Sequence, residues 1–267
     1  MRASALPPEG SVPSVARAPD EPGGAVRGLL VRGGMLALVI AKAGKIGLTV
    51  GTMIISIGAY SLLFGWRYAV GFVLLIFIHE MGHFLAARQR GLKVGAPTFI
   101  PFFGAWITLK DMPHNAETEA YVGLAGPVAG TIASIACYVL AVLLQSPLLL
   151  ALAYAGAFIN LFNLVPVSPF DGGRITAVLS PRIWLIGAPI LLGLFVWQRS
   201  PILIVMLIMA APQVMTAFRY DPHAPQNAAY YATTTTTKVI YGTIYLGLVG
   251  FLALASYELH QMLEGGA

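Results

Sequence analysis

Long uninterrupted apolar runs dominate this sequence and restrict its possible folds more than any other feature. Residues 46–64 and 68–87 form the first two runs, and a membrane-spanning helix needs about 20 such residues. Only 10% of the residues are charged, whereas soluble domains carry roughly 25%. Lipid cannot satisfy open backbone groups, and the runs are continuous rather than short and alternating, so we expect helices and not a barrel.

Further apolar runs follow at residues 119–144, 147–166, 183–198, 201–218 and 239–259. The sequence therefore predicts an all-α polytopic membrane protein with about seven transmembrane helices. Residues 97–109 are apolar but short and interrupted by prolines. We expect them to form a re-entrant β-hairpin with strands at 98–100 and 105–109.

The basic residues predict an orientation. If the N-terminus is cytoplasmic and the spans alternate, all 16 lysines and arginines except Arg67 and Arg199 fall on the cytoplasmic side, as the positive-inside rule requires. The net charge of +5 is scattered through loops, so nucleic acid is not an expected partner. We expect an integral protein of a bacterial inner membrane, with the lipid bilayer as its surroundings.

The second apolar run ends in a motif that carries chemistry, His79-Glu80-Met81-Gly82-His83. Residues four apart share one helical face, so both imidazoles can reach one zinc ion, and Glu80 can accept a proton from zinc-bound water. A carboxylate inside a membrane costs roughly 2.5 kcal/mol or more. A bound metal offsets that cost, so the alternative of three merely solvated side chains is disfavoured.

A catalytic zinc site needs a third protein ligand and one open position. The metzincin continuation would place glycine at 86 and histidine at 89, where this chain has Ala86 and Gln89. The polar residues near cytoplasmic membrane ends are Asp111, His114, Glu117, Glu119, Asn160, Asn163 and Asp171. Of these residues, Asp171 follows the span 147–166 on the side predicted to be cytoplasmic, which is also the side of His83.

Asp171 stands in that segment, between Pro166, which is expected to end the helix, and a glycine pair. Gly172 and Gly173 are expected to permit a tight turn before the next helix. The alternative for Asp171 is an N-cap for the segment that starts at Arg174.

Together, two motifs resemble the site-2 protease family of intramembrane zinc metalloproteases, in a compact form. The first is H-E-x-G-H at residues 79–83, and the second is N-x-x-P-x-x-x-x-D-G from Asn163 to Gly172. The resemblance implies one Zn²⁺ per chain. It also implies that the substrate is a membrane protein, cleaved in or near a transmembrane segment.

The resemblance implies roles for single residues as well. His79, His83 and Asp171 would be the zinc ligands, and Glu80 the general base. Asn163 would position the substrate or stabilise the oxyanion, with simple helix packing as the alternative.

Residues 101–107 resemble the hairpin that this family inserts beside its active site. The resemblance implies that Phe103, Gly104, Ala105 and Trp106 bind an extended substrate, which would add to the hairpin as a strand. An interfacial anchor of aromatic side chains is the alternative. Gly126 and Gly130 form a small-xxx-small pair that resembles the family's third core span and predicts close helix packing.

Three regions follow from these observations. Residues 1–27 are rich in proline and are expected to be a disordered tail. Residues 45–180 are the expected metalloprotease core, and residues 181–267 are additional transmembrane helices, separated by a polar loop at 221–237. No segment is long enough for a PDZ or CBS domain. Two other functions remain open: a catalytically silent zinc-binding scaffold, and a metal or proton transporter.

Overall fold

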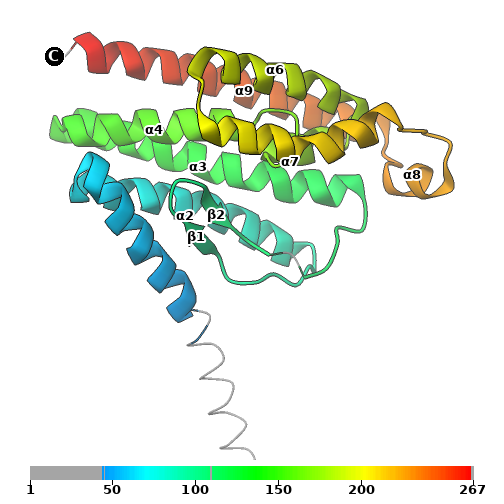
Figure 1. Cartoon of the computed structure of the whole chain (residues 1–267), viewed down its shortest axis with the longest axis horizontal. Helices are drawn as coiled ribbons and strands as arrows, with labels where there is room; N and C mark the ends of the chain where they lie inside the picture. The colour runs from blue at the N-terminus through cyan, green and yellow to red at the C-terminus, as the bar shows by residue number, and fades with distance from the viewer. Residues whose placement is uncertain (1–43, 45, 109, 266–267) are drawn as a thin grey trace, which may run out of the picture. The chain divides into compact units, whose positions relative to one another are not determined.

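The all-α membrane class is confirmed by a computed structural model, which describes residues 44, 46–108 and 110–265 (Figure 1). The chain divides into two units, Met1–Lys45 and Ile46–Ala267, and the following description concerns the second. The predicted tail at residues 1–27 lies outside the described residues. Among the residues described, six helices are long and apolar enough to cross a membrane.

The spanning helices run over Ile46–Phe64, α2 (Trp66–Gln89), α3 (Ala116–Leu144), Pro181–Gln198 with α6 (Trp184–Gln198), α7 (Pro201–Phe218) and α9 (Thr235–Gly265). The shorter helices are α4 (Pro147–Asn163), α5 (Asp171–Thr176) and α8 (Pro225–Tyr230). The predicted span at residues 147–166 corresponds to α4, which is apolar but has only 17 residues.

Local sequence signals set the ends of α3 and α4. The Asn115 side chain caps α3 by accepting a hydrogen bond from the Thr118 N–H at 2.8 Å. Ser146 caps α4, and Pro147 occupies its first turn, where no N–H is needed. The predicted end of this span at residue 166 is wrong, because α4 stops at Asn163. A proline disfavours helical backbone at the residue before it, so Pro166 ends the helix early.

Helix α3 lies between α2 and α4, and α4 packs in turn against α9, while α6 and α7 form a pair (Figure 1). Gly82 of α2 shows how close the first contact is, since a Cβ there would overlap the backbone carbonyl of Ala125. The short helix α5 packs on α3. Residues from α2, α4 and α5 are thereby brought together inside the bundle.

The predicted hairpin is present as β1 (Thr98–Ile100) and β2 (Gly104–Trp106), paired antiparallel. The second strand is shorter than the predicted 105–109. The reason is a change of partner: the Thr108 carbonyl accepts from the Gly95 N–H at 2.8 Å, so this part of the chain pairs with the segment before β1.

The prediction that residues 221–237 form a polar loop is wrong in part, because this segment contains α8 and the start of α9. Helix α8 begins with Pro225 in its first turn. The Tyr230 hydroxyl donates to Glu119 at 2.7 Å, which fastens this segment to the first turn of α3.

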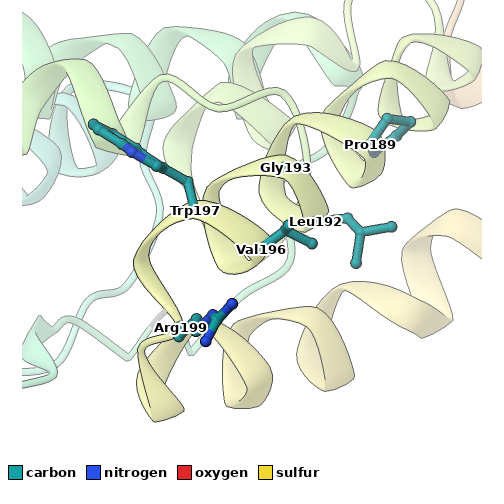
Figure 2. Close-up of a pocket in the computed structure, with 6 residues that line it drawn as sticks. All are labelled: Pro189, Leu192, Gly193, Val196, Trp197 and Arg199. Carbon is teal, nitrogen blue, oxygen red and sulfur yellow. The ribbon is translucent and has the colours of Figure 1, made fainter.

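An open depression of about 790 Å³ lies along α6, lined by Pro189, Leu192, Gly193, Val196, Trp197 and Arg199 (Figure 2). Its walls are mostly apolar side chains of a spanning helix, and Trp197 is 79% exposed. Such a surface suits contact with lipid chains. It holds no group able to act as a nucleophile, base or metal ligand.

Candidate active site

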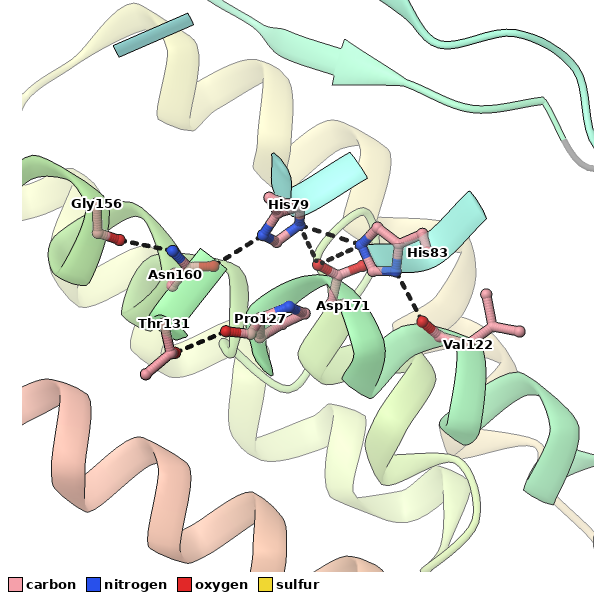
Figure 3. A network of polar contacts seen from close by, with 8 residues as sticks. All are labelled: His79, His83, Val122, Pro127, Thr131, Gly156, Asn160 and Asp171. Atoms are coloured by element: carbon pink, nitrogen blue, oxygen red, sulfur yellow. Dashed lines mark hydrogen bonds and ion pairs between the residues drawn. The ribbon is translucent and has the colours of Figure 1, made fainter. Parts of the chain in front are cut away.

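Two histidines one helical turn apart form the first half of the site (Figure 3). Their positions on α2 bring His79 Nε2 and His83 Nε2 to 3.1 Å from each other. Both side chains are buried although α2 is an apolar membrane span. The predicted common face of the two imidazoles is therefore present in the structure.

Asp171 supplies the second half of the site from 88 residues further along the chain. Its Oδ2 lies 3.1 Å from His79 Nε2 and 3.2 Å from His83 Nε2. The three ligand atoms lie within 4.8 Å of one another, and all three residues are buried. Two imidazole nitrogens and one carboxylate oxygen are a donor set that zinc prefers, with a fourth position left for water or substrate.

The N-cap alternative for Asp171 is wrong. Phe170 holds the N-cap position of α5, Asp171 is the first helical residue, and no side chain caps this helix. The carboxylate instead faces the imidazoles. Burial alone would raise the pKa of Asp171, but the adjacent His83 and His79 rings hold that pKa well below its ordinary value. The side chain is therefore an anion at neutral pH, as a carboxylate ligand must be.

Each imidazole uses its other ring nitrogen to bond outward. His83 Nδ1 lies 2.7 Å from the carbonyl oxygen of Val122 on α3. His79 Nδ1 lies 2.8 Å from Oδ1 of Asn160 on α4. Metal-binding histidines are commonly oriented by such contacts to the far nitrogen. From the sequence, Asn160 is one of several polar residues near the ends of the spans, and its contact with His79 was not predicted.

The glycine pair on α3 makes room for site side chains. A Cβ at Gly126 would overlap the His83 ring, and a Cβ at Gly130 would overlap the Asn160 amide. The predicted close packing is thus partly explained by the His83 and Asn160 side chains rather than by backbone contact alone. Any larger residue at either position would displace the site.

The glycine pair on α5 does not form the predicted tight turn. Gly172 and Gly173 are helical, and neither has a positive φ. They are needed for close approach, because a Cβ at Gly172 would overlap the Leu164 carbonyl and one at Gly173 would crowd the Ser168 N–H. The start of α5 is therefore pressed onto the segment that precedes it.

Helices beyond the predicted core hold that segment in place. Trp184 Nε1 on α6 donates to the Gly173 carbonyl at 2.8 Å. The Gln213 side chain on α7 accepts a hydrogen bond from the Ser168 N–H. The Tyr245 hydroxyl on α9 donates to the Leu164 carbonyl at 2.6 Å. Three helices after residue 180 thus fix the backbone that carries Asp171.

Glu80 is buried next to His79 on α2. Among the described residues its carboxylate has no hydrogen-bond partner. Asn163 is the last residue of α4 and is partly exposed. Its side chain likewise bonds to none of the described groups. The catalytic roles of both residues stay predictions.

The predicted substrate-binding residues lie on the hairpin. Gly104, Ala105 and Trp106 form β2, and Phe103 is in the turn before it. Phe103 and Trp106 are about half exposed, at 52% and 57%. The hairpin packs near the site, with the Phe99 ring 6.4 Å from that of Phe77 on α2. Contact with a substrate and the role of an interfacial anchor both stay predictions.

Comparison with known proteins adds to this geometry. Residues 67–150 match the model of peptidase family M50, and this stretch contains the H-E-x-x-H motif. Over this stretch the chain is similar to that peptidase family. Asp171 lies beyond the matched stretch, and its place in the site is given by the structure. The similar proteins are named zinc metalloproteases, and the three converging side chains form a donor set that fits Zn²⁺.

Several zinc metalloproteases are similar to this chain. One from Methanocaldococcus jannaschii is 32% identical over 124 residues, which cover 43% of this chain and 36% of that protein. The probable chloroplast zinc metalloprotease EGY1 of Arabidopsis thaliana is 28% identical over 199 residues, covering 50% and 36%. The putative zinc metalloprotease Rip3 of Mycobacterium tuberculosis is 26% identical over 132 residues, covering 45% and 33%. The aligned part is about a third of the length of each relative.

Proposed function

We propose that this chain is a zinc metalloprotease that hydrolyses peptide bonds in or near the transmembrane segments of membrane-protein substrates. One observation carries the proposal: His79, His83 and Asp171 meet inside a bundle of membrane-spanning helices. A buried cluster of this kind is costly in an apolar span unless it has a function. The relatives' shared name, zinc metalloprotease, gives the reaction class.

The depth of the site is compatible with hydrolysis. His83 lies six residues before the last residue of α2, Gln89, which corresponds to about 9 Å of helix. The site is thus below the membrane surface but near one end of the bundle. Water can reach such a depth through a short polar opening, and a transmembrane substrate can reach it from the side.

The chemistry follows from the residues in place. A zinc ion at His79, His83 and Asp171 would polarise the scissile carbonyl and make water more acidic. Glu80, whose carboxylate has no other described partner, accepts the proton of the attacking water and passes it to the leaving amine. Asn163, close in sequence to the start of α5, positions the substrate or donates to the developing oxyanion.

The outer edge of β2 is the proposed substrate strand site. The Phe99 N–H donates to Thr52 Oγ1 at 3.2 Å and so points away from β2. Phe99 pairs with Ala105, and in such a non-hydrogen-bonded pair both residues direct their backbone groups outward. The Ala105 N–H and C=O are therefore available to an extended peptide. A substrate helix that unwinds into a strand at this edge would expose peptide bonds that the helix hides.

The proposed orientation places the N-terminus and the opening of the site in the cytoplasm of a bacterial inner membrane. The protein is an integral membrane protein. If its spans alternate from a cytoplasmic N-terminus, every lysine and arginine except Arg67 and Arg199 is expected on the cytoplasmic side. The expected partners are the lipid bilayer and a membrane-protein substrate.

The function is tested with Glu80→Gln protein reconstituted in proteoliposomes with a single-span substrate. Removal of a general base lowers the rate by about 10²–10⁴-fold. The variant should lose cleavage by that factor and still bind zinc, because its three ligands are intact. Cleavage at the parental rate by Glu80→Gln would end the proposed mechanism.

A further inference from the structure

We infer that Asn160 is a positioning residue of the metal centre, which fixes the proton of His79 on Nδ1 and so presents Nε2 to the metal. The inference rests on the proposed zinc site but concerns a residue outside its ligands. Asn160 lies on α4, whereas His79 and His83 lie on α2 and Asp171 on α5.

The orientation of the Asn160 amide is determined by its two partners (Figure 3). One end of the amide lies 2.7 Å from the carbonyl oxygen of Gly156. A carbonyl only accepts hydrogen bonds, so the NH₂ group must face Gly156. The amide oxygen, Oδ1, therefore faces His79, where it lies 2.8 Å from Nδ1.

The tautomer of His79 follows from that orientation. An amide oxygen only accepts, so Nδ1 of His79 must carry the hydrogen. Nε2 is then the ring nitrogen with a free electron pair, and it is the one that points at Asp171, 3.1 Å away. The two bonds of Asn160 thus select the form of His79 that can bind a cation.

The second histidine is fixed differently. His83 Nδ1 bonds to the backbone carbonyl of Val122, which no substitution of a side chain removes. The two ligands therefore have separate supports, one from the main chain and one from a side chain. Only the support of His79 can be removed by changing one residue.

The surroundings of Asn160 are shaped for this side chain. Asn160 is 2% exposed, among the most buried residues of the described chain. Gly130 on α3 leaves the space that the amide fills, since a Cβ there would overlap both amide atoms. A buried amide in an apolar bundle is costly unless fully bonded. Both ends of this one are bonded, so its role is to hold His79 rather than to fill space.

A packing role and a positioning role predict different results. Leucine has the same branching at Cγ as asparagine, but it accepts no hydrogen bond. In Asn160→Leu the Nδ1–H of His79 would be buried without a partner. Aspartate keeps an acceptor for Nδ1. Thr131→Val is the matched control, because buried Thr131 bonds only to the Pro127 carbonyl of its own helix.

The experiment measures zinc affinity by chelator competition on the purified full chain, with the absorption spectrum of bound Co²⁺ as a second readout. Loss of the hydrogen bond to the outer nitrogen of a metal-binding histidine lowers metal affinity by about 10–100-fold. Asn160→Leu should lose that much and change the Co²⁺ spectrum. The zinc affinity of Asn160→Asp should stay within about tenfold of the wild-type value. Thr131→Val should match wild type in both readouts.

Two results would overturn the inference. One is wild-type zinc affinity in folded Asn160→Leu. The other, decisive even if the leucine variant fails to fold, is Asn160→Asp losing more than 100-fold in affinity or losing the Co²⁺ spectrum. Neither readout needs proteolysis. A wild-type protein that binds zinc through Asn160-supported His79 but cleaves no substrate would contradict the proposed function and leave this inference intact.

Discussion

The hydroxyl of Tyr245 donates a hydrogen bond to the backbone carbonyl of Leu164 at 2.6 Å, across 81 residues of sequence. Leu164 directly follows α4, where helical carbonyls lose their partners within the helix. Tyr245 lies on α9, the last helix. This bond, with those from α6 and α7, gives the helices after residue 180 a part in holding the segment that presents Asp171.

Substitution of Tyr245 by phenylalanine removes only that hydroxyl. A buried hydrogen bond contributes about 1 kcal/mol, which should lower Tm by about 2–4 °C in a chain of this size. Thermal unfolding of detergent-solubilised protein measures the change. Tyr257→Phe is the control, because Tyr257 is on the same helix and 61% exposed. Equal Tm values for the two variants would show that the bond carries no stability.

Gly126→Ala should damage the metal site without altering any ligand. The added Cβ would overlap the His83 ring, so the imidazole must move away from His79 and Asp171. We expect zinc affinity to fall by about tenfold or more. Gly193→Ala on α6 has open space at its Cβ, and alanine favours helix. Titration of both variants with zinc should separate them, and equal affinities would refute the steric account.

Ala105→Pro tests the free edge of β2. Proline removes the N–H that points outward and leaves the hydrogen bonds between β1 and β2 in place. Cleavage of the single-span substrate should fall by about fivefold or more, which is about 1 kcal/mol of lost binding, while zinc affinity stays constant. Ala105→Ser keeps the N–H and should cleave normally. Unchanged KM and kcat in the proline variant would remove β2 from the substrate site.

Much of this architecture could be predicted from the sequence, because the signals are local. The apolar runs predicted the spans. The strand at residues 98–100 was predicted from its position between Pro97 and Pro101. The spacing of His79 and His83 is a property of any helix. The H-E-x-x-H motif therefore gave the arrangement of two ligands before any tertiary contact was known.

The rest depends on contacts between distant segments. Asn160 resembled any polar residue in an apolar helix until α4 was placed beside α2, although its presence in such a run was a signal in itself. The role of Gly130 could not be separated from ordinary helix packing, since it depends on Asn160 being opposite. The tight turn predicted at Gly172 and Gly173 is wrong because close approach, and not backbone freedom, explains glycine there.

The central claim is that His79, His83 and Asp171 together bind one zinc ion. Zinc content and X-ray absorption of the purified chain test it most directly, in wild type, in Asp171→Ala and in the exposed control Asp221→Ala. Wild type and control should hold about one zinc each, with imidazole nitrogens and a carboxylate oxygen at about 2.0–2.2 Å, and Asp171→Ala should lose most of its metal. One zinc per chain with unchanged coordination in Asp171→Ala would contradict the account.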